Sequence, residues 1–481
     1  MGNQIQVKGE KPQFLSLKVI LPVTSLGVFM GPLDGSIVNV ALVTISKMLN
    51  TDMAGVRWIV IVYLLVMSAA MGLSGNLGDN FGRRRIFNLG LGLFVLGSLF
   101  CALSFTLELL ILSRILQAFG AAGVTANGLA ILMFYTEPRH RGRAIGFNSL
   151  VVATALISGP ILGGVLTQFF GWPMIFLINI PIGVLAIILS YRLIPETPKK
   201  EVVNFDYLGV ALFAMIAFAF VGGLLFFFEG LQLQIWNWGA LLLVFLAIGL
   251  TIIFVYIESN HPSPMISISL LKNKKILIGL ISAAFCYMAV NGTFFLLPFF
   301  YQEILLFTPG ETGILLIVSP IIMAVSGPLT GLLAERFEAR KLATLGAFLQ
   351  GLFILILATI NPQMALITII LLVALSAGSL AIFTNSNGTS VMNASPKTHM
   401  STVSGLLNLS RTIAFATATG LSSAFFGLFF AINNPTGATS GLVYESAYYQ
   451  SLGITFTILA LFALVGMIVS FMRGRETIKR E

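Results

Sequence analysis

Long apolar runs separated by short polar gaps fill almost the whole chain. Fourteen of these runs are long enough to cross a bilayer, which takes roughly 20 apolar residues per helix. They cover residues 17–42, 57–77, 86–104, 108–134, 144–169, 174–193, 207–228, 239–257, 276–301, 312–334, 342–360, 364–386, 403–430 and 448–472. Because the runs are continuous and do not alternate with polar residues, they argue against a membrane β-barrel. The pattern predicts an all-α polytopic membrane protein.

Composition supports this prediction and excludes other classes of protein. Of the 481 residues, 57% are hydrophobic and only 9% are charged, whereas a soluble domain carries roughly 25% charged residues. This excludes a soluble enzyme, a disordered chain and a protein with a single membrane anchor. Cys101 and Cys286 both lie inside apolar runs, so we expect no disulfide framework. The three histidines lie in separate polar gaps, and we expect no metal site.

The net charge of +9 is arranged as a topology signal. Lysine and arginine collect in alternate gaps and in both tails, for example at 83–85, 139–143 and 272–275, whereas the opposite gaps carry mainly acids. Positively charged loops stay in the cytoplasm, and an even number of spans places both termini on one side. We therefore expect a multi-pass protein of the cytoplasmic membrane with both termini in the cytoplasm, and no nucleic-acid partner.

The chain contains a weak internal repeat. Residues 75–85 and 331–341 each begin with glycine, continue with an acid and a phenylalanine, and end in basic residues. Each stretch lies between two predicted spans in the corresponding place of its half. The repeat predicts two six-helix halves, 1–200 and 273–481, with two inserted helices in 201–272. Repeated six-helix halves are typical of transporters whose substrate site lies between the halves near the membrane midplane.

Several motifs resemble those of the major facilitator superfamily. Residues 75–85 resemble its helix 2–3 loop signature, 110–120 its helix-4 signature and 159–164 its antiporter signature. Residues 33–42 resemble the helix-1 signature of the fourteen-helix drug:proton antiporter branch (multidrug efflux type), which 175–181 and Trp58 with Tyr63 also fit. The resemblance implies the major facilitator fold with 14 transmembrane helices. The sequence departs from the usual motifs at Asn80 in the helix 2–3 loop, at Ala118 in helix 4 and at Glu338 in the corresponding loop of the second half.

Asp34 is the one acid deep inside a predicted span. Burying an ionised carboxylate in hydrocarbon is costly, so such a residue is functional by default. Asp34 and Arg114 lie at matching depths, because each is six to eight residues from the same end of its helix and a helix rises about 1.5 Å per residue. We expect them to pair. Protonation of Asp34 would then release Arg114, and the resemblance also assigns Arg114 to proton coupling. A static ion pair, or a structural acid bonded to Ser36 or Asn39, is the alternative.

Two further motifs take their expected roles from the resemblance. Asp79, Arg83 and Arg84 are expected to form a conformational latch between the halves, the alternative for the arginines being simple anchoring of the loop. The antiporter motif, Gly159, Pro160, Gly163 and Gly164, is expected to favour export by exchange. Proline removes a backbone hydrogen bond and small residues let helices approach closely, so a plain kink in this helix is the alternative.

Polar residues in the other spans are candidates for a substrate cavity. They are Asn39, Tyr63, Gln117, Asn148, Asn291, Asn385 and Arg411. Arg411 either faces the cavity or extends to the cytoplasmic surface. If it faces inward, the cavity holds two arginines against one acid, which fits a neutral or anionic substrate better than a multiply charged cation.

These features predict a secondary active transporter that exports amphipathic or lipophilic compounds such as drugs in exchange for protons, by alternating access. The alternative is the same fold exporting an endogenous metabolite, such as a lipid, siderophore or organic anion. No phosphate-binding loop for ATP is present in the sequence, and Asp34 lacks the partner acid or histidine that a membrane enzyme would need. We expect no enzymatic activity, no cofactor, a small-molecule substrate, protons and the lipid bilayer as partners, and function as a monomer.

Overall fold

The computed structural model describes residues 15–197, 206–232, 237–261, 264, 266–334, 337–396 and 399–474. These residues form helices and short connections, with no strand among them. Fourteen helices in this part of the chain are long and apolar enough to cross a membrane, which confirms the predicted number of spans and the all-α polytopic class. Glu335 and Arg336 of the second loop stretch, together with Lys199, Lys200 and Lys397, lie outside the described residues.

The first nine helices are α1 (Leu17–Met48), α2 (Met53–Phe81), α3 (Arg83–Ala102), α4 (Leu107–Tyr135), α5 (Arg141–Phe170), α6 (Met174–Leu177), α7 (Asn179–Leu193), α8 (Tyr207–Gln232) and α9 (Trp238–Asn260). The others are α10 (Ile268–Leu271), α11 (Lys274–Phe299), α12 (Pro309–Leu316), α13 (Val318–Ala334), α14 (Ala339–Leu357), α15 (Leu366–Asn393), α16 (Met400–Asn433) and α17 (Leu442–Phe471). A 3₁₀ turn (Pro138–His140) precedes α5, and a π-helical turn (Phe300–Ile304) extends α11.

Several helix ends differ from the predicted ones. α15 continues to Asn393 although its apolar run was predicted to end at 386, α1 continues to Met48, and α17 begins at Leu442. These extensions carry polar residues, which weaken the hydropathy signal. They stay helical because a helix satisfies its own backbone hydrogen bonds whatever its side chains are.

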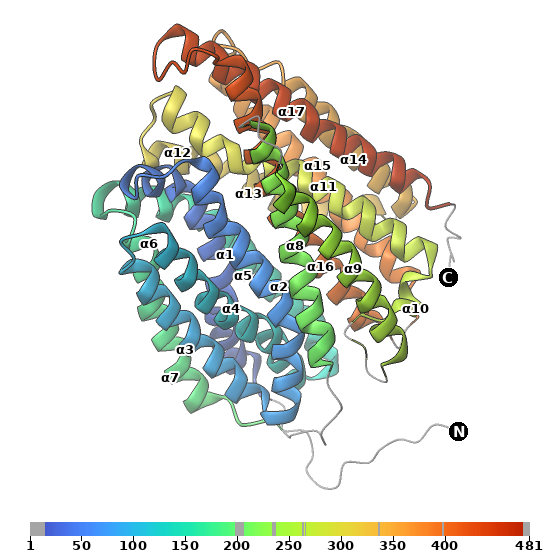
Figure 1. Ribbon diagram of the computed structural model, residues 1–481. Coiled ribbons are helices and arrows are strands. Elements are labelled where there is room, and N and C mark those ends of the chain that lie inside the picture. The colour runs from blue at the N-terminus through green and yellow to red at the C-terminus, as the bar shows by residue number, and fades with distance from the viewer. Residues whose placement is uncertain are drawn as a thin grey trace, which may run out of the picture.

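The spans gather in two groups with one hairpin between them (Figure 1). The N-terminal group, α1–α7, and the C-terminal group, α11–α17, each pack mainly within themselves. They meet where α2 packs on α16 and where α5 packs on α12. We call the side where α1 begins and α17 ends the terminal side, and the other the opposite side. The domain division at 1–200, 201–272 and 273–481 agrees with this grouping but stays a prediction.

Small residues bring α3 and α4 into backbone contact. A Cβ at Gly97 of α3 would lie 2.6 Å from the backbone nitrogen of Gln117, and one at Gly90 would lie 2.9 Å from that of Val124. Larger side chains would hold the two helices apart, because helices approach this closely only over small residues. This contact places the polar side chains of α3 within reach of those of α4.

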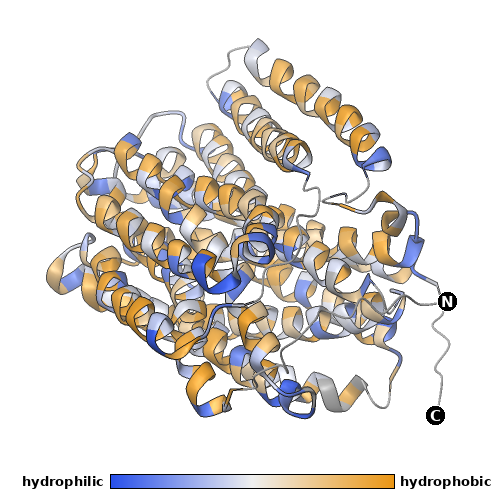
Figure 2. Ribbon diagram, turned by 90° about the horizontal axis from the view of Figure 1, so that it is seen from below, coloured by the Kyte–Doolittle hydropathy of each residue, from blue (hydrophilic) through white to orange (hydrophobic). Residues whose placement is uncertain are grey.

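The hairpin α8–α9 lies at the outside of the bundle. α8 packs on α2 and α16 as well as on α9, whereas α9 packs on α8 and α10. Figure 2 shows two adjacent helices projecting from one side of the molecule, with apolar residues prevailing along nearly every helix. Large apolar side chains of α9 are exposed, among them Leu242, Phe245 and Ile252. Such a surface is suited to lipid.

Candidate functional site

Asp34 and Arg114 form an ion pair in the interior of the N-terminal group. Asp34 comes from α1 and is fully buried, and Arg114 comes from α4 and is 1% exposed. The Nη1 atom of Arg114 donates to Oδ2 of Asp34 at 2.5 Å. The structure thus brings together the two residues that helix depth predicted to meet. A buried pair is stable only if further hydrogen bonds satisfy both groups.

Two amides supply those further bonds. Gln117 donates from Nε2 to Oδ1 of Asp34 at 2.8 Å, and Asn179 donates from Nδ2 to the same oxygen at 3.2 Å. Both amides also donate to the hydroxyl of Ser98, at 2.9 and 3.4 Å. Nη1 of Arg114 donates to Oε1 of Gln117 at 2.6 Å. We call Asp34, Ser98, Arg114, Gln117 and Asn179 the Asp34 network.

An aromatic ring lies against the guanidinium of the Asp34 network. The ring centroid of Tyr63 is 3.9 Å from Cζ of Arg114, and that of Phe176 is 5.7 Å away. A cation over an aromatic face is attracted by the ring quadrupole. Nε of Arg114 donates to the backbone carbonyl of Ile59 at 3.3 Å. The Tyr63 hydroxyl is buried, and it has no hydrogen-bond partner among the described residues. It is therefore a buried polar group beside the ion pair whose hydrogen bond is not made within the described residues.

The alternative bonding of Asp34 to Ser36 or Asn39 is not what the structure shows. The hydroxyl of Ser36 donates within its own helix, to the carbonyl of Pro32 at 2.9 Å. Asn39 is half-buried and makes no side-chain hydrogen bond among the described residues. The partners of Asp34 therefore come from α4 and α7, helices distant in sequence.

The antiporter motif of α5 faces two different helices. Gly159 and Gly163 pack against α1. A Cβ at Gly163 would be 2.7 Å from the carbonyl oxygen of Ile37. Gly164 packs against α12, and a Cβ at Gly164 would overlap the carbonyl of Pro309. The contact is reciprocal, because a Cβ at Gly313 would overlap the carbonyl of Pro160. The motif therefore sits where the N-terminal group meets the C-terminal group.

The predicted latch residues lie at the turn between α2 and α3. Gly82 makes this turn with a φ of 104°, in the region that favours glycine. Nη2 of Arg83 donates to Oδ1 of Asp79 at 2.7 Å. Arg84 donates to the carbonyl of Ile194 at 2.8 Å and lies 3.4 Å from Glu196. These contacts tie the turn to the segment that follows α7. A role as a latch between the halves stays a prediction.

The predicted cavity residues do not form one cluster. Tyr63 and Gln117 lie at or in the Asp34 network. Asn291 of α11 donates to the carbonyl of Phe415 and to the hydroxyl of Thr419, at 3.0 and 3.2 Å, and so joins α11 to α16. The other predicted cavity residues make no side-chain hydrogen bond or ion pair in the described part of the chain. They are Asn39, Asn148, Asn385 and Arg411.

The sequence analysis did not identify Ser98 and Asn179 as members of the network, and it did not identify the pair of Arg57 and Glu229. In the structure Arg57, which is 1% exposed, pairs with Glu229 of α8. Gln302 donates to the carbonyl of Val40 at 3.0 Å and joins the C-terminal group to α1. The sequence does show that Ser98 and Asn179 are polar residues inside apolar spans. It does not show which way their side chains point.

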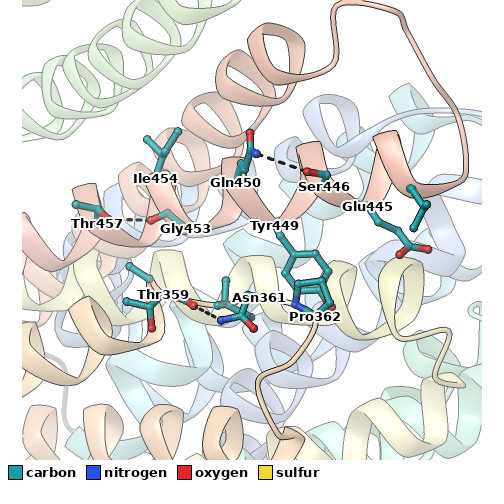
Figure 3. Close-up of a pocket in the computed structure, with 13 residues that line it drawn as sticks. Thr359, Asn361, Pro362, Glu445, Ser446, Tyr449, Gln450, Gly453, Ile454 and Thr457 are labelled. Carbon is teal, nitrogen blue, oxygen red and sulfur yellow. Dashed lines mark hydrogen bonds between the residues drawn. The ribbon is translucent and has the colours of Figure 1, made fainter.

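A cavity of about 840 Å³ lies on the opposite side, between the α14–α15 connection and the first turns of α17 (Figure 3). Glu445, Tyr449 and Gln450 line it together with Asn361 and Pro362. All of its lining residues belong to the C-terminal group. A site between the halves needs residues of both, so this cavity is not the candidate translocation site.

Comparisons with known proteins agree with this architecture. The family described as Major Facilitator Superfamily matches residues 24–419. The riboflavin transporter RibZ of Clostridioides difficile is 30% identical over 96% of this chain and 98% of its own. The methylenomycin A resistance protein of Bacillus subtilis is 30% identical over 82% of this chain and 84% of its own, and the multidrug resistance protein Stp of Mycobacterium tuberculosis is 30% identical over 81% and 72%.

Solved structures share the fold. A bacterial homologue of the human lysosomal transporter Spinster, in an inward-facing and occupied conformation, superimposes with a TM-score of 0.68 at 16% identity, covering 97% of both chains. The nucleoside transporter NupG superimposes with a TM-score of 0.65 at 12% identity, covering 95% of this chain and 100% of its own. Together with the family match, these findings confirm the resemblance seen in the sequence motifs: the chain belongs to the Major Facilitator Superfamily, a family of membrane transporters.

Proposed function

We propose that this transporter exports amphipathic or lipophilic compounds, such as drugs, across the cytoplasmic membrane in exchange for protons. The observation that carries the proposal is the Asp34–Arg114 pair, a fully buried carboxylate and guanidinium at 2.5 Å in the interior of the spans. Intramembrane ionisable residues mark proton relays and substrate paths. Asp34 is the titratable acid of the Asp34 network.

A proton on Asp34 would change the network directly. It removes the negative charge that Arg114 pairs with and leaves the guanidinium with the carbonyl groups of Gln117 and Ile59 as acceptors. A buried charge that has lost its partner is costly, so the protonated state favours a rearrangement of α1 against α4. Such a change can couple proton binding to movement of the two groups of helices by alternating access.

Orientation follows from the distribution of charge. Arginine and lysine dominate the terminal side, including Arg83–Arg85, Arg139–Arg143 and Lys272. The positive-inside rule places that side, with both termini, in the cytoplasm. The substrate would then enter from the terminal side and leave on the opposite side.

The driving force would be the proton gradient, with no cofactor. Inward movement of one proton supplies about 2.3 kcal/mol per 100 mV of membrane potential, in addition to any pH difference. The partners of the proposed function are a small-molecule substrate, protons and the lipid bilayer, without nucleic acid or an enzymatic reaction, and the protein works as a monomer.

An endogenous metabolite, such as a lipid, siderophore or organic anion, is the second candidate substrate. The relatives named above support both readings, because two are resistance proteins and one is a riboflavin transporter that aligns over nearly its full length. A substrate panel must therefore include metabolites as well as drugs.

The test is proton movement in proteoliposomes with a pH-sensitive dye inside, using ethidium, riboflavin and fluorescein as cationic, neutral and anionic substrates. We expect at least one of them to drive proton exchange in the wild-type protein. Asp34→Asn should abolish exchange without preventing insertion. Asp52→Asn is the matched control, because Asp52 caps α2 at its exposed end and asparagine is an equally good cap. Proton exchange at the wild-type rate in Asp34→Asn, or none with any substrate in the wild type, would contradict the proposal.

A further inference from the structure

One face of α16 carries an arginine that has no ion-pair partner among the described residues. Ser404, Asn408, Arg411 and Phe415 follow at intervals of four, three and four residues, which places them on one side of a helix. Ser404 and Arg411 are exposed, and Asn408 and Phe415 are half-buried. We call these four residues the Arg411 face.

The Arg411 face points away from the outside of the bundle. Leu409 and Ile413 pack in a cluster with Leu212 and Phe213 of α8. Further along α16, Ala416 packs with Leu225 of α8, as does Gly420. At 3.6 residues per turn these positions lie on the side of α16 opposite to Arg411. Because α8 and α9 form the outer edge of the bundle, the Arg411 face is turned away from that edge and toward the inside of the bundle, where Phe415 meets α11.

Depth within the membrane supports the same conclusion. Arg411 lies eleven residues after Met400, the first residue of α16, which is about 16 Å along the helix. An arginine at this depth is costly in lipid and normally faces a water-containing space. Among the described residues Arg411 forms no ion pair and no side-chain hydrogen bond. Its five donors are therefore available to a ligand.

The charge balance around this space is positive. Asp34 and Arg114 neutralise each other and are buried at 0% and 1% exposure. They leave Arg411 as the uncompensated charge among the intramembrane residues singled out above. Of the two arginines that the sequence sets against one acid, Arg411 is the one without an ion pair in the described part of the chain.

Aromatic surface lies one turn beyond the arginine. The ring of Phe415 meets that of Tyr287 of α11 edge to face, with centroids 5.6 Å apart. Asn291 donates to the backbone carbonyl of Phe415 at 3.0 Å and fixes this part of α16 to α11. The guanidinium of Arg411 thus lies one turn from two packed aromatic rings, Phe415 and Tyr287. This arrangement suits a ligand that has an acidic group and a flat apolar body.

We infer that Arg411 binds the anionic group of the transported compound, a carboxylate, sulfonate or phosphate, while the aromatic body of that compound lies along Phe415. The inference rests on the proposed function and gives its substrate class as anionic amphiphiles. Arginine recognises such groups through two parallel N–H donors. The position of Arg411 in the half of α16 nearest the terminal side makes it accessible to a compound arriving from the cytoplasm.

The test uses two dyes with the same xanthene ring and opposite charge, fluorescein and rhodamine 123. Binding to purified protein in nanodiscs of zwitterionic lipid is followed by fluorescence anisotropy, with no proton gradient. We expect the wild-type protein to bind fluorescein more tightly than rhodamine 123. Arg411→Gln should weaken fluorescein binding at least tenfold and leave rhodamine 123 binding within twofold, and Arg411→Lys should retain part of the fluorescein affinity. Arg192→Gln is the control, because it removes an exposed cytoplasmic-end arginine that has no ion pair in the described part of the chain.

The inference is overturned if the wild-type protein prefers rhodamine 123 or does not bind fluorescein. It is also overturned if Arg411→Gln binds fluorescein as tightly as Arg192→Gln does. The result is separable from the proton-exchange experiment, because dye binding at equilibrium requires no proton movement. Failure of Asp34→Asn to change exchange would remove the coupling mechanism and leave the Arg411 result standing.

Discussion

The side chain of Asp34 is surrounded by donors. Oδ2 accepts from Arg114, and Oδ1 accepts from the amides of Gln117 and Asn179. An ionised carboxylate only accepts, so all of these contacts suit the charged form. A protonated carboxyl must donate one hydrogen bond, and none of these neighbours presents an acceptor to it. Protonation would therefore require an amide to turn or the guanidinium to move, and the proton switch proposed above rests on this requirement.

The first prediction concerns the stability of this pair. Arg114→Gln should destabilise the protein by about 3–5 kcal/mol, because the remaining charge of Asp34 stays buried without its partner. The double variant Asp34→Asn with Arg114→Gln should recover part of this loss, since no uncompensated charge is left. Thermal unfolding in detergent measures both variants. A double variant less stable than Arg114→Gln alone would show that the two charges are not coupled.

The sequence predicted part of this site for an identifiable reason. Asp34 and Arg114 were found because a charge in an apolar span is rare and because helix rise fixes depth. Ser98 and Asn179 were missed because small polar residues are common in spans, and their direction depends on how α3, α4 and α7 pack. The partner of Arg57 could not be predicted either, because Glu229 lies in α8, far away in sequence.

At the level of elements, the hairpin α8–α9 is fixed by a few specific contacts. Glu229 of α8 pairs with the buried Arg57 of α2, and Leu225 fills the space over Gly420 of α16. Asn237 closes the hairpin by donating to the carbonyl of Phe226 at 3.2 Å. Since α8 contacts both α2 and α16, the hairpin bridges the N-terminal and C-terminal groups.

The second prediction tests this attachment. Glu229→Gln should leave the Arg57 charge buried without its partner and loosen α8 from α2. Hydrogen–deuterium exchange should rise in α8 and in the first turns of α2, while exchange in α14 and α15 stays unchanged. Glu445→Gln is the control, because Glu445 also lies on the opposite side but makes no ion pair among the described residues. Equal exchange in α8 of the two variants would show that the ion pair does not hold the hairpin.

Hydropathy predicted the fourteen spans found among the described residues. It did not predict the helix ends or the contacts between helices, which depend on packing. The fourteen spans follow from length and apolar content, whereas the ends of α1, α15 and α17 continue through polar residues. Glu229 shows the same limit at a helix end. The sequence marks it as an acid near a gap, and only the position of α8 beside α2 makes it the partner of Arg57.

In the whole molecule, the two groups of helices are joined closely on the opposite side. Gly164 and Gly313 let α5 and α12 touch through their backbones. Gln168 at the end of α5 accepts from the backbone N–H of Gly310 at 3.1 Å, and Gln302 donates to the carbonyl of Val40. A path to the opposite side would have to separate these contacts. The observed arrangement is therefore closed there, and transport by alternating access would require α5 to move away from α12.

The last prediction uses this closure. A variant with Gln168→Cys and Gly310→Cys should be cross-linked by a short thiol-reactive reagent, because the two residues are in contact. The two native cysteines, Cys101 and Cys286, are buried and should react little. Cross-linking should stop transport in proteoliposomes while binding of substrate from the terminal side persists, and cleaving a reducible linker should restore transport. The single-cysteine variants, treated in the same way, control for modification alone. Full transport by the cross-linked protein would mean that α5 and α12 stay together throughout the cycle, and substrate would then have to leave by a route that does not pass between them.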